Sequence, residues 1–314
     1  MDNPERITDK PVVSIVLPVY NGERFLASAI ESVLAQSIPE WELLIVDDGS
    51  ADGSSAICDR FASQDARIKV FHQPNGGVNS ARAKGVDNAA GEYLAFLDAD
   101  DRFVPDALEY LLASSTPETD LLLAEERPDA WVTRDSYLAE LWTGKVGPAL
   151  WGKLFRTAVY KRIDYTLDRR LAMGEDLLLN SMYALEADRI RLLPRRIYEV
   201  NLENEASVTK TFKHNWEYEK YYFSKVDELF LRKCTELASY DQIKLLVGKS
   251  WLNAMKYVML DGGKIDYDDT EFKAVQDYFK DKSQALGPSE KLIFSVKNSF
   301  LYRTVLKVFL KLKG

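Results

Sequence analysis

The architecture of this chain can be read outward from one stretch, Glu42-Leu43-Leu44-Ile45-Val46-Asp47-Asp48-Gly49-Ser50. Its first five residues form a short, almost continuous apolar run, which is typical of a strand buried on both faces of a parallel sheet. Two acids and a glycine follow directly. Open α/β sheets bind ligands at the carboxyl ends of their strands. The stretch therefore predicts a buried strand that delivers Asp47 and Asp48 to a binding edge. A capped loop fits the same residues equally well, because Asp and Ser are common N-cap residues.

Similar apolar runs recur on both sides of this stretch. Segments with apolar residues at helical spacing separate the runs. Strands that alternate with helices in this way indicate an α/β fold with a mostly parallel, twisted sheet and helices on both faces. The expected strands are residues 12–17, 42–46, 68–71 and 93–97, and the expected helices are residues 24–36, 54–63, 78–90 and 105–113.

The pattern is less regular after residue 116. We expect a strand at residues 121–124, a helix at 176–186 and one or two short strands within 190–200, whereas 131–142 is ambiguous. From residue 213 onward almost every segment has helical spacing. We therefore expect two parts, an α/β domain over residues 1–210 and a helical extension over residues 211–314.

The composition excludes several classes of protein. The chain is 46% hydrophobic and 29% charged, which excludes wholesale disorder. Its net charge of −8 disfavours a general affinity for nucleic acid, so no nucleic-acid partner is expected. Two distant cysteines, Cys58 and Cys234, make neither a disulfide framework nor a zinc motif, and we expect both to be buried thiols.

A second acidic motif, Asp98-Ala99-Asp100-Asp101, follows the expected strand at residues 93–97. Asp98 and Asp100 are two residues apart, so they point to the same side of an extended backbone. Three acids in four residues repel one another unless a cation neutralises them. Divalent ions such as Mg²⁺ and Mn²⁺ prefer oxygen ligands and often share such sites with substrate phosphates. The motif therefore predicts a metal site that also binds a phosphorylated ligand.

A glycine-containing loop, Asn75-Gly76-Gly77, lies between the two acidic motifs and leads into an expected helix that contains Arg82. Glycines let a backbone approach a ligand, and the start of a helix offers unpaired N–H groups. An arginine at this place suits a diphosphate. A surface loop with a solvated arginine fits the spacing equally well.

Four stretches resemble the family 2 glycosyltransferases, in the family's order and at its spacing. The resemblance is close over residues 11–112 and thinner to about residue 210. It implies a GT-A fold, which is an α/β sheet that binds a nucleotide sugar and holds a metal through a DxD motif. The four stretches are Val13-Ser14-Ile15-Val16-Leu17-Pro18-Val19-Tyr20-Asn21, Val46-Asp47-Asp48-Gly49-Ser50, Asn75-Gly76-Gly77 with Ala81-Arg82, and Gly91-Glu92-Tyr93-Leu94-Ala95-Phe96-Leu97-Asp98-Ala99-Asp100-Asp101.

The resemblance assigns roles residue by residue. Asp48 would meet the uracil or the ribose, and Arg82 would lie near the nucleotide or its phosphates. Asp98 and Asp100 would hold Mn²⁺ or Mg²⁺, with Asp100 favoured as the direct ligand. Lys84 stands where many relatives carry a small or polar residue and receives no role. The residues expected to bind the donor are Pro18, Tyr20, Asn21, Asp47, Asp48, Arg82, Asp98 and Ala99.

Met173-Gly174-Glu175-Asp176 resembles the Glu-Asp segment that starts a helix after the DxD motif in this family. By that likeness Asp176 is the base that removes the proton of the acceptor hydroxyl, and Glu175 supports it or binds the acceptor. Two acids at a helix N-terminus are also favourable on electrostatic grounds alone. Trp151 lies in a stretch that precedes this segment in many relatives, and it would either stack on a sugar or lie in the core.

The function implied by the resemblance is that of an inverting, metal-dependent glycosyltransferase. It would move a sugar from a nucleotide diphosphate, most plausibly UDP, to a glycan or lipid-linked glycan in cell-surface polysaccharide synthesis. No Gln-x-x-Arg-Trp motif follows the Glu-Asp segment, so we expect a non-processive enzyme. A nucleotidyltransferase would carry a glycine-rich basic loop where Pro18-Val19-Tyr20-Asn21-Gly22 stands, and a non-catalytic binding module would have lost the acids.

The end of the chain differs in charge from the rest. Residues 289–314 have a net charge of +5 and the remainder −13, and basic residues alternate with apolar ones at helical spacing. A basic amphipathic helix of this kind lies in a membrane interface. The alternative is a helix packed on the protein or on a second copy in a homo-oligomer. Residues 1–10 lack a signal peptide's apolar core and no run reaches 18 apolar residues, so we expect a cytoplasmic protein that docks on the inner leaflet.

Deletion of residues 289–314 should reduce binding to anionic membranes, because each basic residue near an anionic surface contributes about 1 kcal/mol. The measurement is co-sedimentation with vesicles that contain an anionic lipid, with zwitterionic vesicles as the control. Unchanged co-sedimentation of the shortened chain would contradict membrane docking.

Overall fold

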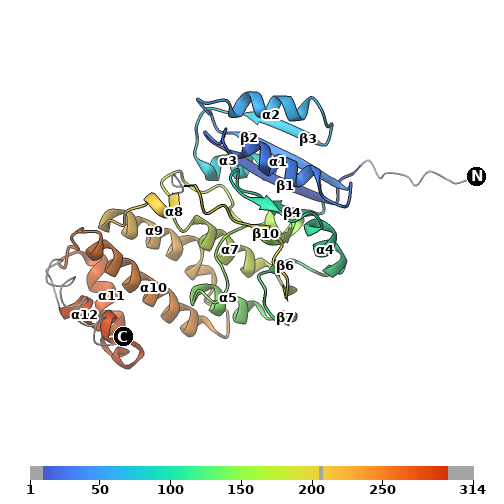
Figure 1. Ribbon diagram of the computed structural model, residues 1–314. Helices are drawn as coiled ribbons and strands as arrows, with labels where there is room; N and C mark the ends of the chain where they lie inside the picture. Colours follow the sequence, from blue (N-terminus) through green and yellow to red (C-terminus); the bar gives the residue numbers. More distant parts are fainter. Residues whose placement is uncertain (1–9, 205–207, 296–314) are drawn as a thin grey trace, which may run out of the picture. The chain divides into compact units, whose positions relative to one another are not determined.

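The computed structural model describes residues 10–204 and 208–295, and the chain divides into two compact units, residues 1–207 and 208–314. The first unit is built on a twisted mixed sheet with strand order β3-β2-β1-β4-β8-β6-β9-β7 (Figure 1). Most of the segment expected at a membrane, residues 296–314, lies outside the described residues. Among the described residues no helix is long and apolar enough to cross a bilayer.

The amino-terminal half of the sheet is parallel. Its strands are β1 (Val13–Val19), β2 (Trp41–Asp47), β3 (Ile68–His72) and β4 (Tyr93–Phe96). Every residue of β2 is buried, as its apolar run predicts. The pairing of Val19 with Asp47 and of Asp47 with His72 aligns the carboxyl ends of three strands. The two acidic motifs, which follow β2 and β4, therefore come out at the same edge.

The other half of the sheet contains a reversed strand. The strand β8 (Lys153–Arg156) runs antiparallel to both β4 and β6 (Leu121–Ala124) and lies between them. Beyond β6 come the parallel strand β9 (Ile190–Leu193) and the antiparallel strand β7 (Ala130–Val132). The ambiguous segment 131–142 is therefore split between β7 and a helix. Because β8 begins and ends with basic residues, its sequence gives no apolar run to indicate a strand.

A separate two-stranded sheet lies beside the second acidic motif. It pairs β5 (Arg102–Phe103) with β10 (Tyr198–Glu199) in antiparallel fashion, with Phe103 opposite Tyr198. The strands β9 and β10 account for the one or two strands expected within residues 190–200. This pairing carries a segment distant in the sequence to the residues that directly follow the DxD motif.

The helices of the first unit follow the expected spacing. The helix predicted at residues 105–113 begins later, because Asp106 has a non-helical backbone, with φ −113° and ψ 21°. The helices are α1 (Leu26–Leu34), α2 (Ser54–Ala62), α3 (Val78–Asn88), α4 (Ala107–Ser114), α5 (Arg134–Trp142), α6 (Thr157–Tyr160) and α7 (Glu175–Glu186).

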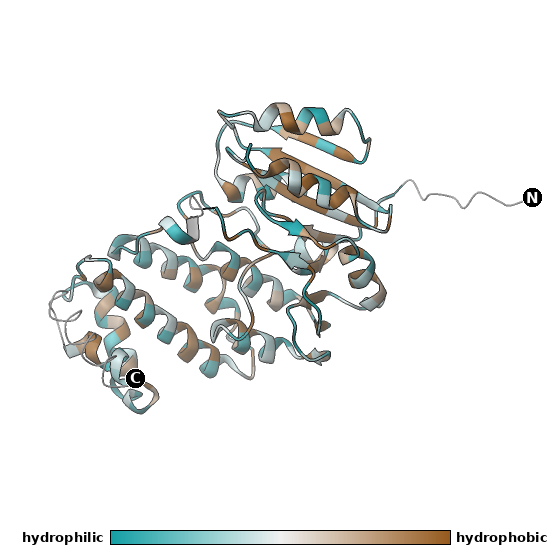
Figure 2. Ribbon diagram, in the orientation of Figure 1, coloured by the Kyte–Doolittle hydropathy of each residue, from teal (hydrophilic) through white to brown (hydrophobic). Residues whose placement is uncertain are grey.

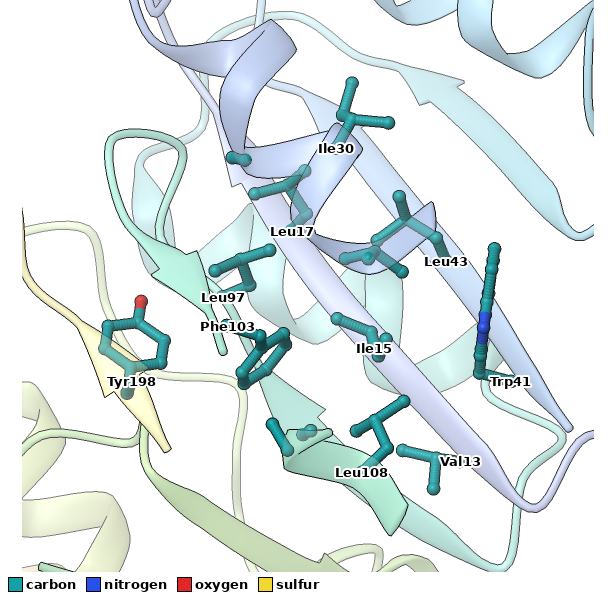
Figure 3. Close-up of a cluster of buried hydrophobic side chains, with 14 of the residues drawn as sticks. Val13, Ile15, Leu17, Ile30, Trp41, Leu43, Leu97, Phe103, Leu108 and Tyr198 are labelled. Atoms are coloured by element: carbon teal, nitrogen blue, oxygen red, sulfur yellow. The ribbon is translucent and has the colours of Figure 1, made fainter. Parts of the chain in front are cut away.

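The core of the first unit lies on the strands. Figure 2 shows apolar residues concentrated along the parallel strands. Figure 3 shows Ile15 and Leu17 of β1 beside Leu43 of β2, with Ile30 of α1 close by, and each of these side chains is fully buried. Cys58 packs in the same core. Both cysteines are buried free thiols, as expected, and burial raises the pKa of Cys58 to about 12.

The second unit is helical over its described residues, as the spacing after residue 213 predicts. Its centre is aromatic, with the ring of Phe223 stacked on Trp251 at a centroid distance of 4.8 Å. The α-helices are α8 (Val208–Thr211), α9 (Trp216–Leu229), α10 (Tyr240–Leu260), α11 (Thr270–Lys280) and α12 (Pro288–Ser295), and the 3₁₀ turns are η1 (Leu231–Lys233) and η2 (Ser283–Ala285).

Gly85 lets α3 lie directly on β1. A Cβ atom at this position would come within 2.4 Å of Cγ1 of Val16. Gly85→Val should therefore destabilise the first unit by about 2 kcal/mol through overpacking, seen as a lower midpoint of thermal unfolding. The matched control is Lys84→Val, which places the same side chain on the exposed face of the same helix. Equal effects of the two substitutions would contradict the close approach.

Candidate active site

The loops after β1 and β2 are tied together at the ligand edge of the sheet. The backbone N–H of Asn21 donates to Oγ of Ser50 (3.0 Å), and the Asn21 side chain accepts from the N–H of Ala51 (2.8 Å). Asn21 has a φ of 51°, in the left-handed region that asparagine tolerates. Tyr20 precedes it and is 57% exposed. Pro18, in β1, is half-buried. The loop after β1 therefore leaves Tyr20 accessible beside the first acidic motif.

Asp47, the last residue of β2, is buried and is hydrogen-bonded to residues at the carboxyl edge of the sheet. Its carboxylate accepts from the N–H of Ser50 (3.0 Å) and lies 2.9 Å from Nδ1 of His72, whose Nε2 lies 3.0 Å from Asp59. Hydrogen bonds to Asp47 and Asp59 raise the pKa of His72, and the polar partners of Asp47 lower its own pKa against the opposing effect of burial. Asp47 therefore remains ionised at the end of β2.

Asp48 holds the glycine loop. Its Oδ1 accepts from the N–H of Gly76 (2.8 Å) and its Oδ2 from the N–H of Gly77 (2.7 Å), while the side chain of Gln73 donates to Oδ1 (2.8 Å). Gly49 makes this approach possible, since a Cβ there would lie 2.9 Å from the backbone nitrogen of Asn75 at a φ of 76°. The first acidic motif and the glycine loop thus form one structure.

Arg82 joins the second acidic motif to the Glu-Asp segment. Its Nη1 donates to Oδ1 of Asp176 (2.8 Å) and to Oε1 of Glu175 (3.4 Å), and its Nη2 lies 3.5 Å from Oδ1 of Asp98. The side chain of Arg82 is 9% exposed, and its Nε is buried without a partner among the described residues. Three carboxylates from two distant segments therefore surround one buried guanidinium.

The single positive charge of Arg82 does not fully offset the three carboxyl groups around it in this largely buried position. Burial, followed by the neighbouring Asp176, raises the pKa of Glu175 to about 7. Burial also raises the pKa of Asp98, against the opposing effect of Arg82. The pKa of Arg82 is raised, because the attraction of the carboxylates outweighs the effect of burial. Shifts of this kind, caused by burial and like charges, are typical of functional sites.

The helix α7 presents Glu175 and Asp176 in its first turn. The turn into the helix passes through Gly174, which has a φ of 84° and so favours glycine. Two acids at this end are favoured by the helix dipole. The helix dipole and the turn at Gly174 thus account for two acids at the start of α7. The hydrogen bonds from Arg82 account for the position of both acids near Asp98.

The DxD turn is held by the second small sheet and the residues after it. The N–H of Asp98 donates to Oη of Tyr198 (2.9 Å), Asp101 accepts from the N–H of Asn201 (2.7 Å), and Asp100 accepts from Nδ2 of Asn204 (2.7 Å). Burial raises the pKa of Asp101 to about 6. Asp101 is therefore a structural acid of this turn.

Asp98 and Asp100 have the chemistry of a divalent metal site. Their carboxylate oxygens are the hard ligands that Mg²⁺ and Mn²⁺ prefer, and such ions commonly use one or two carboxylates and complete their coordination with substrate phosphates and water. No group of three or more His, Cys, Asp or Glu side chains is placed to hold a metal ion among residues 10–204 and 208–295. Asp98 and Asp100 therefore fit a divalent ion whose remaining coordination positions a bound diphosphate and water would fill.

Several contacts at this edge of the sheet could not be predicted from the sequence pattern. Arg169 donates to the backbone and side-chain oxygens of Asn75 (3.0 and 2.8 Å), and Asn79 donates to the carbonyl of Leu171 (2.9 Å). These bonds tie the segment before α7 to the glycine loop and to α3. Only their positions in the fold identify them. Lys84, for which sequence gave no role, is exposed, with its ammonium 5.8 Å from the ring centre of Phe71.

Trp151 has an aromatic partner within the protein. Its ring stacks on Tyr198 with a centroid distance of 4.8 Å and an interplanar angle of 8°. Trp151 is half-buried and packs against the core of the first unit. The structure therefore places the Trp151 ring against Tyr198 and the edge of the core. Stacking of Trp151 on a sugar stays a prediction.

Comparison with known proteins agrees with this arrangement. Residues 14–157 match the model of glycosyl transferase family 2. The chain is 37% identical over 186 residues to the putative glycosyltransferase EpsH of Bacillus subtilis, covering 54% of each chain. It is 30% identical over 234 residues to the uncharacterized glycosyltransferase EpsJ of the same organism, covering 64% of this chain and 63% of EpsJ. The chain therefore spans roughly half to two thirds of the length of these relatives.

Solved structures share the fold at low identity. S. aureus TarS in complex with UDP-GlcNAc has a TM-score of 0.67 and 18% identity, over 95% of this chain and 91% of that chain. The mannosyltransferase PcManGT of Pyrobaculum calidifontis, in complex with GDP-Man and Mn²⁺, has a TM-score of 0.50 and 16% identity, over 97% of this chain and 89% of that chain. Residues 14–157 thus match glycosyl transferase family 2, and the fold of the chain is GT-A.

Proposed function

We propose that this protein is a glycosyltransferase that moves a sugar from a UDP-sugar to an acceptor hydroxyl. The observation that carries the proposal is the cluster around Arg82, in which Asp98 of the DxD motif and Asp176 of α7 share one guanidinium. A transfer reaction needs a site for the leaving diphosphate beside a base for the incoming hydroxyl. Asp98 and Asp176 supply carboxylates for these two tasks within reach of one another.

The donor would bind at the carboxyl edge of the parallel strands. Tyr20 is exposed there, and the loops that carry Asp47 and Asp48 are already ordered by internal hydrogen bonds. Uridine is favoured because the structural neighbour TarS binds UDP and UDP-GlcNAc. Asp48 is buried and accepts from Gln73, Gly76 and Gly77, so its part in the donor site would be to hold the glycine loop in place.

The reaction then needs few residues. Asp176 takes the proton of the acceptor hydroxyl as that oxygen bonds to the anomeric carbon, and the bond to the diphosphate breaks with the electron pair leaving on UDP. Attack opposite the leaving group inverts the anomeric centre. A divalent ion held by Asp98 and Asp100 would supply charge neutralisation for the leaving diphosphate. The raised pKa of Glu175 keeps this neighbour partly protonated, so that it can donate a hydrogen bond.

The acceptor is proposed to be a glycan or lipid-linked glycan of a cell-surface polysaccharide. Besides the two Eps relatives, the chain is 44% identical over 101 residues to the putative teichuronic acid biosynthesis glycosyltransferase TuaG of Bacillus subtilis, covering 32% of this chain and 40% of TuaG. A lipid-linked acceptor is compatible with docking of residues 289–314 on the inner leaflet, where the enzyme would add one sugar per encounter.

Replacing both metal-site acids should abolish transfer. Asp98→Ala with Asp100→Ala removes the carboxylates proposed for the ion, and turnover should fall by about 10³-fold or more, since electrostatic stabilisation of a leaving group is a large term in such reactions. The measurement is UDP release from UDP-GlcNAc, UDP-glucose and UDP-galactose with Mn²⁺, alongside circular dichroism. Asp268→Ala, at an exposed acid, is the control. Full activity of the double variant would refute the metal assignment.

Glu175→Gln should stabilise the protein at high pH. Because the pKa of Glu175 is raised from its ordinary 4.5 to about 7 in the folded state, the folded protein binds a proton that the unfolded chain releases. Stability from this group is therefore present below about pH 4.5 and is lost as the pH rises to 7. The neutral glutamine should raise the free energy of unfolding by about 3 kcal/mol at pH 8, with little change at pH 4.5.

Chemical denaturation at the two pH values measures this difference without any ligand. Glu186→Gln is the matched control, because Glu186 is exposed at the other end of the same helix. A gain of equal size at both pH values, or none at pH 8, would contradict the raised pKa.

A further inference from the structure

Lys153 is a buried charged residue that the proposed chemistry does not use. Its side chain is fully buried at the start of β8. Its Nζ donates to the carbonyl oxygens of Gly147 (3.0 Å) and Ala149, and lies 3.7 Å from Oε1 of Glu125. Burial lowers the pKa of Lys153 to about 8. A buried ammonium is unfavourable unless it is paired and hydrogen-bonded, so the contacts of Lys153 must offset the cost of its burial.

The two carbonyls to which Lys153 donates belong to one short segment, residues 147–151. The N–H of Gly147 donates to Oε2 of Glu125 (3.1 Å), so the lysine and the glutamate hold the segment together. From the other side, Nδ2 of Asn180 donates to the carbonyl of Pro148 (2.6 Å) and to that of Asp176 (3.0 Å). Asn180 is fully buried in α7. One end of the segment is therefore fastened to the helix that carries the proposed base.

The other end of the segment reaches the DxD turn. Trp151 stacks on Tyr198, and the hydroxyl of Tyr198 accepts the N–H of Asp98. Gly152 then turns the chain into β8 at a φ of 71°, and its carbonyl accepts from the N–H of Ala124 (2.9 Å). Residues 147–151 thus reach the backbone of Asp176 through Asn180 and the backbone of Asp98 through Tyr198.

We propose that Lys153 is a positioning residue that fixes the spacing between the DxD turn and the start of α7 through residues 147–151. The inference rests on the proposed function, in which Asp98 and Asp176 act on the same substrates. The carbonyls of Gly147 and Ala149 converge on one buried point and need donors. A lysine brings three donors on a flexible stem, whereas an apolar side chain would leave the carbonyls unpaired and release the segment.

The first test is independent of activity. Lys153→Met removes the donors and keeps an unbranched side chain. Amide hydrogen exchange should rise over residues 147–152 and also at the DxD turn and over residues 175–178. Val33→Ala, a buried change in α1 outside this segment, is the control for general loss of stability. Faster exchange confined to residues 147–152, or equal to that of Val33→Ala, would overturn the proposal.

The second test uses a matched substitution and a coupled pair. Lys153→Met should reduce turnover of the best UDP-sugar by about 100-fold, because a displacement of about 1 Å can cost that much, and should leave the Kd for UDP with Mn²⁺ within threefold. Lys153→Arg keeps the donors and should lose less than tenfold. Lys153→Met combined with Asn180→Leu should cost no more than the worse single variant, since both act on one segment. Additive losses, or a Kd that rises in parallel with the loss of turnover, would overturn the proposal.

Failure of the proposed function is visible separately. If Asp176→Asn retained full turnover, the base assignment would fail whatever Lys153 does. If the wild-type protein turned over no UDP-sugar, the exchange measurement would still decide whether Lys153 links the two carboxylate groups.

Discussion

The interaction on which the site depends is the buried guanidinium of Arg82 among three carboxylates. The carboxyl groups of Glu175 and Asp176 at the start of α7 and of Asp98 after β4 lie around it, and without a cation between them their ionised forms would repel one another. Removing one partner of a buried ion pair leaves an uncompensated charge and is strongly destabilising. Arg82 is therefore the reason that acids more than 70 residues apart in sequence can lie in one place.

The two acidic motifs satisfy their charges in different ways. The first is largely internal, since Asp48 accepts from the glycine loop and Asp47 from Ser50 and His72. These contacts order the loops at the edge where the donor is proposed to bind. The second is less fully compensated, and burial raises the pKa of Asp98 and Asp101. A bound cation would offset this excess of negative charge. This agrees with the proposal that the first motif serves nucleotide recognition and the second serves stabilisation of the leaving group.

Local pattern predicted the parallel half of the fold well, because β1, β2 and β4 are buried apolar runs followed by polar turns. The acidic turns after β2 and β4 indicated Asp47, Asp48 and Asp98 as candidates, and Asp176 came from the resemblance to family 2 glycosyltransferases. Tyr198, Arg169 and Lys153 could not be found in this way, since their contacts join segments far apart in the sequence and have no periodic signal. Arg82 was expected beside the nucleotide phosphates, and its actual partners became visible only when the fold brought α3 and α7 together.

The reversed direction of β8 has a consequence for how such a protein can diversify. Because β8 is antiparallel to β4 and β6, its entry, and not its exit, lies at the carboxyl edge of the sheet. At this edge the first half of the sheet presents loops that leave parallel strands, and the other half presents a loop that enters a reversed one. Insertions before residue 147 can thus change the part of this edge next to β8 while the loops after β1, β2 and β4 keep their sequence, whereas exchanges within residues 147–151 would be felt at both acidic segments.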